Sequence, residues 1–187
     1  MKESSAVSKK WHTALLRGIN VGGNNIISMK ELADTFEGLG FDNVKTYINS
    51  GNVVFTTSAT NDAVLVKNIE TSIEKNFGFK VRAVVKSRPE LAAIVKKIPQ
   101  HWVTDKNMRT EVMFLWREVD KQSVLKQIVT NPDVDHLVYV KGALVWNFDR
   151  TDYKKSKIGK FIGTYVYKNA TGRNANTTRK LLTMMEG

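Results

Sequence analysis

A loop rich in glycine and asparagine has the residue types of an anion-binding site. The first apolar run of the sequence ends at Arg17, and the loop then contributes Asn20, Gly22, Gly23 and Asn24. Adjacent glycines let backbone N–H groups converge on an anion, and an arginine holds a phosphate or carboxylate through two hydrogen bonds. The loop lacks the spacing of a P-loop or of a dinucleotide fingerprint. Two interpretations stay open: an anion site, and a strand-to-helix turn whose asparagines satisfy the backbone.

A second polar group, residues 49–52, lies at a predicted hairpin turn and is called the polar hairpin below. Apolar runs predict a strand before the Gly/Asn loop (residues 18–25), a helix after it, and then two strands joined by the polar hairpin. If the first and third strands are antiparallel neighbours in one sheet, the end of the first lies beside the start of the third, so the polar hairpin should meet the loop. The alternative is a hairpin turn with capping side chains only. The expected patch comprises Arg17, Asn20, Asn24, Asn49, Ser50 and Asn52.

The basic C-terminal segment is a third candidate part of the anion-binding site, besides the Gly/Asn loop and the polar hairpin. Residues 151–187 hold eight Lys and Arg against two Asp and Glu, within a net charge of +11 for the chain. Asn174 or Asn176 is expected to cap the last helix, and Arg173, Asn174 and Thr177 at its start suit a phosphate. A solvated basic face is the alternative. The expected nucleic-acid contacts are Lys154, Lys155, Lys157, Lys160, Arg179 and Lys180.

Composition excludes several classes of protein. The chain has no cysteine, which rules out a disulfide framework, a zinc ribbon and cysteine catalysis. The first ten residues have no apolar core, and no apolar run is long enough to span a bilayer. We expect a soluble, cytoplasmic protein with no membrane partner. A pI of about 9.8 favours an acidic partner.

Catalytic signals are sparse. His12, His101 and His136 are scattered, with no pair at metal-ligand spacing, and no nucleophile elbow occurs. We predict no metal site and no cofactor. Enzymatic activity stays an open question because triads assemble in space rather than in sequence. The oligomeric state is also open.

The positioning elements repeat one pattern. Apolar periodicity predicts strand, helix, strand, strand, helix, strand over residues 11–87, which is the order of a ferredoxin-like plait. A capping box at Ser28 and Glu31 opens the first helix, and Asn61 or Asp62 caps the second. Residues 112–148 repeat strand, helix, strand, strand, with Asp120 expected as the helix cap. Aromatic residues of this half are interpreted as core rather than as a base-stacking platform.

The fold class is therefore α+β, with two tandem ferredoxin-like domains and a C-terminal helical extension. The expected parts are a disordered tail 1–10, a first domain 11–87, a connector helix and loop 88–109, a second half 110–150, and a basic helical extension 151–187. Within the extension we expect a short helix near 156–162, a polar turn at 169–176 and a last helix from Thr177.

Three motifs resemble one family. They are RGINVGG at 17–23, YINSGNV at 47–53, and TGRN at 171–174 continuing to Thr177. Their order and spacing resemble the DUF1697 family of unknown function. The third motif departs from it, with Ala175 where the family usually has an aromatic residue and Gly172 where threonine or a small residue is common. The resemblance implies tandem ferredoxin-like domains and supplies no activity.

We expect a binder of a phosphate-bearing partner, most plausibly nucleic acid. The alternative is a protein that binds a small molecule, an anionic metabolite or nucleotide, or an enzyme acting on one. Its site would then be formed by Arg17, the Gly/Asn loop and the polar hairpin.

Overall fold

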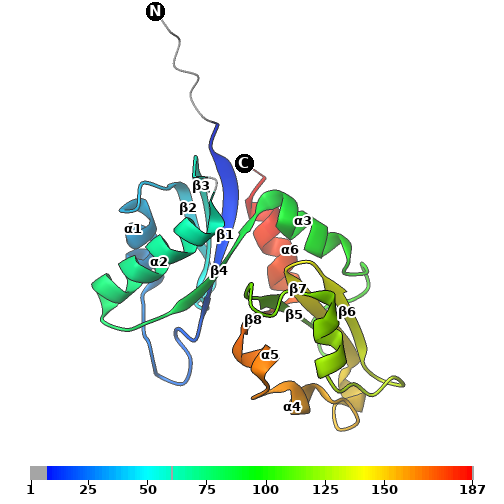
Figure 1. The fold of residues 1–187 in the computed structure, drawn as a ribbon. Coiled ribbons are helices and arrows are strands. Elements are labelled where there is room, and N and C mark those ends of the chain that lie inside the picture. The colour runs from blue at the N-terminus through cyan, green and yellow to red at the C-terminus, as the bar shows by residue number, and fades with distance from the viewer. Residues whose placement is uncertain (1–7, 60, 187) are drawn as a thin grey trace, which may run out of the picture. The chain divides into compact units, whose positions relative to one another are not determined.

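A computed structural model describes residues 8–59 and 61–186. The chain divides into two compact units. Residues 8–88 and 184–186 belong to the first unit, and residues 89–183 form the second. Figure 1 labels the helices and strands of both units.

The first unit is a four-stranded antiparallel sheet with two helices. Its sheet has the order β2-β3-β1-β4, which is the ferredoxin-like arrangement predicted from the sequence. The elements are β1 Lys10–Arg17, α1 Met29–Glu37, β2 Asp42–Tyr47, β3 Asn52–Thr57, α2 Asp62–Phe77 and β4 Arg82–Ser87.

Both helices of this unit pack on the same face of its sheet (Figure 1). Phe36 of α1 and Ile69 of α2 are fully buried with Leu16 of β1 and Phe55 of β3. The predicted caps are present. Ser28 Oγ accepts from the Glu31 N–H, and Asn61 Oδ1 accepts from two N–H groups in the first turn of α2. Apolar periodicity and capping together therefore account for the helical layer of this unit.

The second unit repeats the strand order, but the helices between its paired strands are much shorter than α1 and α2. Its sheet has the order β6-β7-β5-β8, again antiparallel throughout. Trp146 and Phe148 of β7 fill the space under the short helices and are fully buried. The elements are α3 Arg88–Lys96, β5 Met108–Leu115, the 3₁₀ helix η1 Gln122–Gln127, β6 His136–Val140, β7 Ala143–Asp149, the 3₁₀ helix η2 Arg150–Asp152, α4 Ile158–Phe161, α5 Tyr165–Lys168, β8 Ala170–Asn174 and α6 Ala175–Met184.

Predictions at two places in the second unit were wrong, in the C-terminal extension and at Asp120. The segment expected as a polar turn at 169–176 contains β8, which pairs with β5 from Glu111↔Asn174 to Leu115↔Ala170. The sheet therefore extends beyond residue 150, and the last helix begins at Ala175 rather than Thr177. Gly and Asn are rare in strands, and pairing along β5 overrides that preference here.

Asp120 does not cap a helix. The element after it is 3₁₀, and its N-cap position is Lys121, which makes no side-chain capping bond. The Asp120 carboxylate instead accepts from the Tyr139 hydroxyl at 3.0 Å and from the Gly142 N–H at 2.7 Å. The Asp120 carboxylate thereby stabilises the turn between β6 and β7. The pKa of Tyr139 is raised, chiefly because its hydroxyl is desolvated and also because it bonds to this carboxylate.

Candidate functional site

The glycines of the Gly/Asn loop form a tight reverse turn. Gly22 and Gly23 both have positive φ, and the Asn24 N–H donates to the Val21 carbonyl at 3.0 Å. Val21 and Asn24 form a β-bridge across them. Two consecutive residues with positive φ between paired neighbours are typical of a two-residue hairpin turn, which explains the need for glycine. The glycines thus have a structural reason to be there.

The asparagines of this loop bond to its backbone. Asn20 Oδ1 accepts from the Ile27 N–H at 2.8 Å, and Asn20 Nδ2 donates to the Ile27 carbonyl at 2.9 Å. Asn25 Nδ2 donates to the Gly18 carbonyl at 2.9 Å. Asn24 Nδ2 lies 3.3 Å from the Gly22 carbonyl. These bonds hold the path of the chain from β1 to α1, which is what the turn interpretation predicts.

The loop and the polar hairpin meet, as predicted. Asn20 Nδ2 donates to Asn49 Oδ1 at 2.9 Å, and the Leu16 N–H donates to the Gly51 carbonyl at 2.8 Å. Asn52, however, is completely buried, and its Nδ2 donates to the Tyr47 carbonyl and to Ser50 Oγ. Its side chain therefore shapes the turn and does not reach a surface where a ligand could bind.

Arg17 stands at the end of β1, half-buried and directly opposite Arg82 of β4. Side chains of directly paired residues lie on one face of a sheet, so two guanidinium groups share this edge. An edge of that charge suits an anionic group.

The candidate residues around the last helix are mostly buried. Arg173 lies within β8 with 8% of its surface exposed, and its Nη1 donates to the Gly172 carbonyl at 2.7 Å. Desolvation lowers the pKa of Arg173 from 12.5 to about 10. Thr177 is 5% exposed, and its N–H donates to Asn174 Oδ1 at 2.8 Å. Asn174 thus caps α6 as predicted, but a ligand at this helix start would not reach the side chains of Arg173 and Thr177.

Four of the predicted nucleic-acid contacts lie on the crossover segment, which we define as residues 150–169 between β7 and β8. Lys154, Lys155 and Lys160 are exposed, and Lys157 is half-buried. Lys155 forms an ion pair with Asp152 at 2.9 Å. The segment holds six basic residues and one acidic residue. Its lysines are therefore accessible to an anionic partner.

The crossover segment is fixed to the sheet by a buried carboxylate. Asp135, 6% exposed, accepts hydrogen bonds from the Trp146 indole, the Ser156 hydroxyl and the N–H groups of Asn131 and Lys157. Desolvation opposes the charged form, but these four donors outweigh it, and the pKa of Asp135 is lowered from its ordinary value. Ser156 and Lys157 are thereby held against the start of β6.

The last two predicted nucleic-acid contacts differ in exposure: Arg179 is half-buried and bonds to the protein backbone, whereas Lys180 is exposed. Arg179 Nη1 donates to the Trp102 carbonyl at 2.9 Å, and its Nη2 donates to the Pro99 carbonyl at 2.8 Å. Burial lowers the pKa of Arg179. Its guanidinium therefore clamps the loop before β5.

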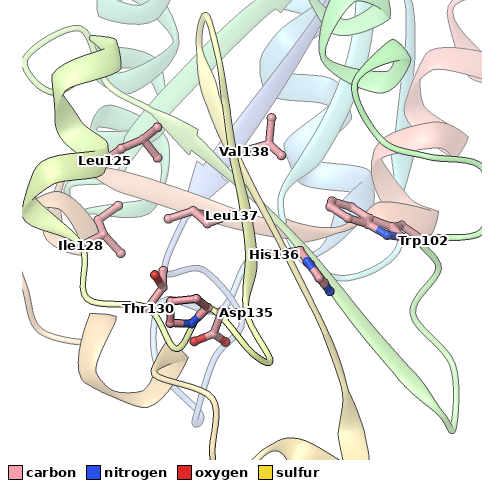
Figure 2. A pocket seen from close by; sticks show the side chains of 9 residues that line it. Trp102, Leu125, Ile128, Thr130, Asp135, His136, Leu137 and Val138 are labelled. Atoms are coloured by element: carbon pink, nitrogen blue, oxygen red, sulfur yellow. The ribbon is translucent and has the colours of Figure 1, made fainter.

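Two neighbouring hollows of the second unit share Trp102 and His136, whose ring centroids lie 5.9 Å apart. The larger of the two hollows, of about 480 Å³, runs along β6, and Figure 2 shows Trp102 beside His136 with Leu125 and Ile128 across the β6 ribbon. The acidic hollow, of about 200 Å³, is lined by His101, Trp102, Met108, Asp133, Val134, His136, Asn147, Asp149 and Asp152.

Sequence reasoning missed several exposed or half-buried residues here. Tyr153 and Tyr165 flank the lysines of the crossover segment and are 53% and 63% exposed. The alternation of tyrosine with lysine was a readable signal for nucleic-acid binding. Trp102 carried no such signal, because most of its neighbours in the hollows, such as Leu125 and His136, come from distant parts of the sequence.

Within residues 8–59 and 61–186, no helix is long and apolar enough to cross a bilayer. In the same part of the chain, no three His, Asp or Glu side chains are arranged to hold a metal ion.

Comparison with known proteins gives a family. Residues 10–146 match the family model described as a protein of unknown function, DUF1697. No curated protein matches the chain. Among solved structures, the conserved bacterial protein SP0830 from Streptococcus pneumoniae is similar, with 29% identity and a TM-score of 0.81. That match covers 95% of this chain and 99% of SP0830. The predicted family is confirmed, and the chain belongs to DUF1697.

Proposed function

We propose that this protein binds nucleic acid in single-stranded form through the crossover segment. The observation that carries the proposal is an exposed run of lysines flanked by two exposed tyrosines on a segment held in place by buried hydrogen bonds. Lysines neutralise phosphates and give affinity that depends on salt. Aromatic rings stack on unpaired bases, whereas the bases of a duplex are already stacked on one another.

The two tyrosines differ in their support. The Tyr153 ring lies against Phe148 with centroids 6.1 Å apart, so one side of the ring is backed by the core. Tyr165 opens α5 and is more exposed. A ring backed by protein has less conformational entropy to lose when a base stacks on it. We therefore expect Tyr153→Ala to weaken binding more than Tyr165→Ala.

Rigid placement of the lysines also favours the proposal. The buried Asp135 carboxylate fixes the backbone at Ser156 and Lys157, and Asn131 Nδ2 donates to the Lys155 carbonyl at 3.3 Å. A segment that is already ordered has less conformational entropy to lose on binding.

Fluorescence anisotropy tests the proposal with single-stranded RNA, single-stranded DNA and duplex DNA over a range of salt concentrations. We expect Lys154→Glu/Lys160→Glu to lower single-strand affinity about tenfold or more at low salt, and to reduce the salt slope by about 1 to 1.5. The matched control is Lys45→Glu/Lys67→Glu, which reverses two exposed lysines of the first unit. Equal losses in both variants, or affinity without salt dependence, would overturn the proposal.

A second candidate function, binding of a small anionic molecule, is favoured by the pairing of Arg17 with Arg82 beside the contact between Asn20 and Asn49. Thermal-shift screening with nucleotides and phosphorylated metabolites tests it. If Arg17→Ala binds the ligand found as well as the wild type does, Arg17 is not part of that site.

A further inference from the structure

We infer that the chain forms a two-fold symmetric dimer through the outer edge of β6, where a second copy adds its own β6 as an antiparallel strand. β6 is the outermost strand of the sheet β6-β7-β5-β8, so in the described chain one of its edges has no neighbouring strand. Such an edge presents backbone N–H and C=O groups with which another strand can pair. The dimer contact uses none of the lysines proposed to bind nucleic acid.

The backbone groups of Leu137 and Tyr139 point to this open edge. A two-residue turn joins β6 to β7, and the residues that flank it, Val140 and Ala143, form a hydrogen-bonded pair. Bonding to β7 alternates along the strand from there, which leaves the N–H and C=O groups of Leu137 and Tyr139 facing outward. In the described part of the chain, these outward backbone groups have no hydrogen-bond partner.

β6 lacks the features that protect the other sheet edges. Its sequence, HLVYV, has no lysine, arginine, carboxylate or proline, and its register with β7 is regular. The other three edge strands of the described sheets carry charged residues: Asp42 and Lys45 in β2, Arg82 and Lys86 in β4, and Arg173 in β8. β2 also has a register shift. Charges and irregular pairing discourage the addition of a strand, so β6 is the edge best suited to it.

The larger hollow lies along this edge. Leu125 and Leu137 pack on the side of the sheet that η1 covers. His136, which lies beside Trp102, is on the opposite face, because successive side chains of a strand point to opposite faces. All four residues line the hollow of about 480 Å³ (Figure 2). The side chains of an added strand also alternate between the faces, and the hollow gives them room on both.

A second copy matches the edge in sequence and in charge. If Val138 lies opposite Val138 of the second copy, Leu137 pairs with Tyr139 in both directions, and every outward backbone group is bonded. Leucine beside tyrosine on one face adds apolar contact. The same register brings the exposed Lys141 to the start of the second copy's β6, close to the exposed Asp133. Two-fold symmetry repeats each of these contacts.

Sedimentation velocity and amide hydrogen exchange of the full chain test the inference over a wide range of protein concentration. We expect a monomer–dimer equilibrium, because two short strands bury less surface than a permanent dimer does. The amides of Leu137 and Tyr139 should gain protection as the concentration rises, whereas that of Val138, which bonds to β7 in both states, should be protected throughout. A chain that stays monomeric at every concentration, even one that binds an extended peptide at this edge, would overturn the inference.

Charge-swap variants locate the contact. Val138→Lys places two lysines opposite each other at the two-fold axis and should weaken dimerisation about tenfold or more, and Val138→Asp should do the same. Mixing the two variants should restore a dimer with one copy of each, which misfolded chains would not form. Thr46→Lys, at a half-buried position of the edge strand β2, is the matched control and should dimerise as the wild type does. Equal dimerisation of Val138→Lys and Thr46→Lys, or no association in the mixture, would refute the β6 contact.

Discussion

The two sheets share one strand order but are covered by unequal helical layers. In the first unit, α1 has 9 residues and α2 has 16, and both bury apolar side chains against the sheet. In the second unit, the corresponding positions hold 3₁₀ helices of 6 and 3 residues and two α-helices of 4 residues each. The difference teaches that the sheet order does not depend on long amphipathic helices.

In the second unit, large aromatic residues and the buried Asp135 carboxylate take the place of long helices. Trp146 packs against Phe161 with centroids 5.6 Å apart, and its indole N–H donates to Asp135. That carboxylate also binds the crossover segment, so a single side chain joins the sheet, the start of β6 and the residues that cover them. Apolar burial is spread over many residues, whereas this anchoring is concentrated in one.

The largest expected effect comes from removing that anchor. Asp135→Ala leaves the Trp146 indole, the Ser156 hydroxyl and two backbone N–H groups without this acceptor, and we expect the free energy of unfolding to fall by about 4 kcal/mol. Hydrogen exchange read separately for β7 and β3 would show the loss in the second unit. Asp133→Ala, at an exposed neighbouring position, is the control. Equal protection of β7 in both variants would contradict the anchoring role.

The next largest effect is expected in the first unit, where the backbone at Gly51 packs closely against the side chains of Leu16 and Ile19. Gly51 has φ +70, and an added Cβ would lie 2.8 Å from Leu16 Cβ and 3.0 Å from Ile19 Cδ1. We expect Gly51→Ala to lower the free energy of unfolding by about 3 kcal/mol, measured by urea denaturation. Gly78 has φ +77 with no atom within 4 Å of the added Cβ. Gly78→Ala should therefore cost only about 1 kcal/mol.

Lowering the pH should destabilise the second unit by protonating Asp135. Its folded-state pKa is lowered, so its contribution to stability is present above the unfolded-state pKa of about 3.9 and is lost as the pH falls through the folded-state pKa. Urea midpoints of the wild type and Asp135→Asn should differ most near neutral pH and converge as the solution becomes more acidic. A constant difference over that range would show that ionisation of Asp135 does not stabilise the fold.

The smallest effect concerns helix caps. Asn61 Oδ1 accepts from Ala63 N–H at 3.0 Å and from Val64 N–H at 3.2 Å, and Asn61→Ala should cost about 1 kcal/mol in thermal denaturation. Lys157 occupies the same position of α4 without a side-chain capping bond. Lys157→Ala should leave stability unchanged. If Lys157→Ala lowers the free energy of unfolding as much as Asn61→Ala does, the helices of the two units do not differ in side-chain capping.

The first unit could be predicted from its sequence because its signals are local. Apolar residues recur at helical spacing after Ser28 and Asn61, and each cap lies next to the helix that it begins. The meeting of Asn20 with Asn49 followed from strand order alone.

The second unit was harder because its determinants are distant along the chain. Pairing with β5 makes a strand of residues 170–174, whose own composition indicates a turn. Asp135 looks like a turn residue until Trp146 and Ser156 are placed beside it. The hollows by Trp102 depend on the same kind of contact, and no local pattern predicts them.

The clamp from α6 to the loop before β5 has a consequence for synthesis. Trp102 and Thr104 leave the ribosome more than 70 residues before Asn176 and Arg179, which hold them. Until those residues emerge, the nascent chain has neither the clamp nor β8 to complete its second sheet. The first sheet has all four strands by Ser87. Translation therefore delivers the first sheet whole by Ser87, whereas the second sheet waits for β8 and its clamp waits for Arg179.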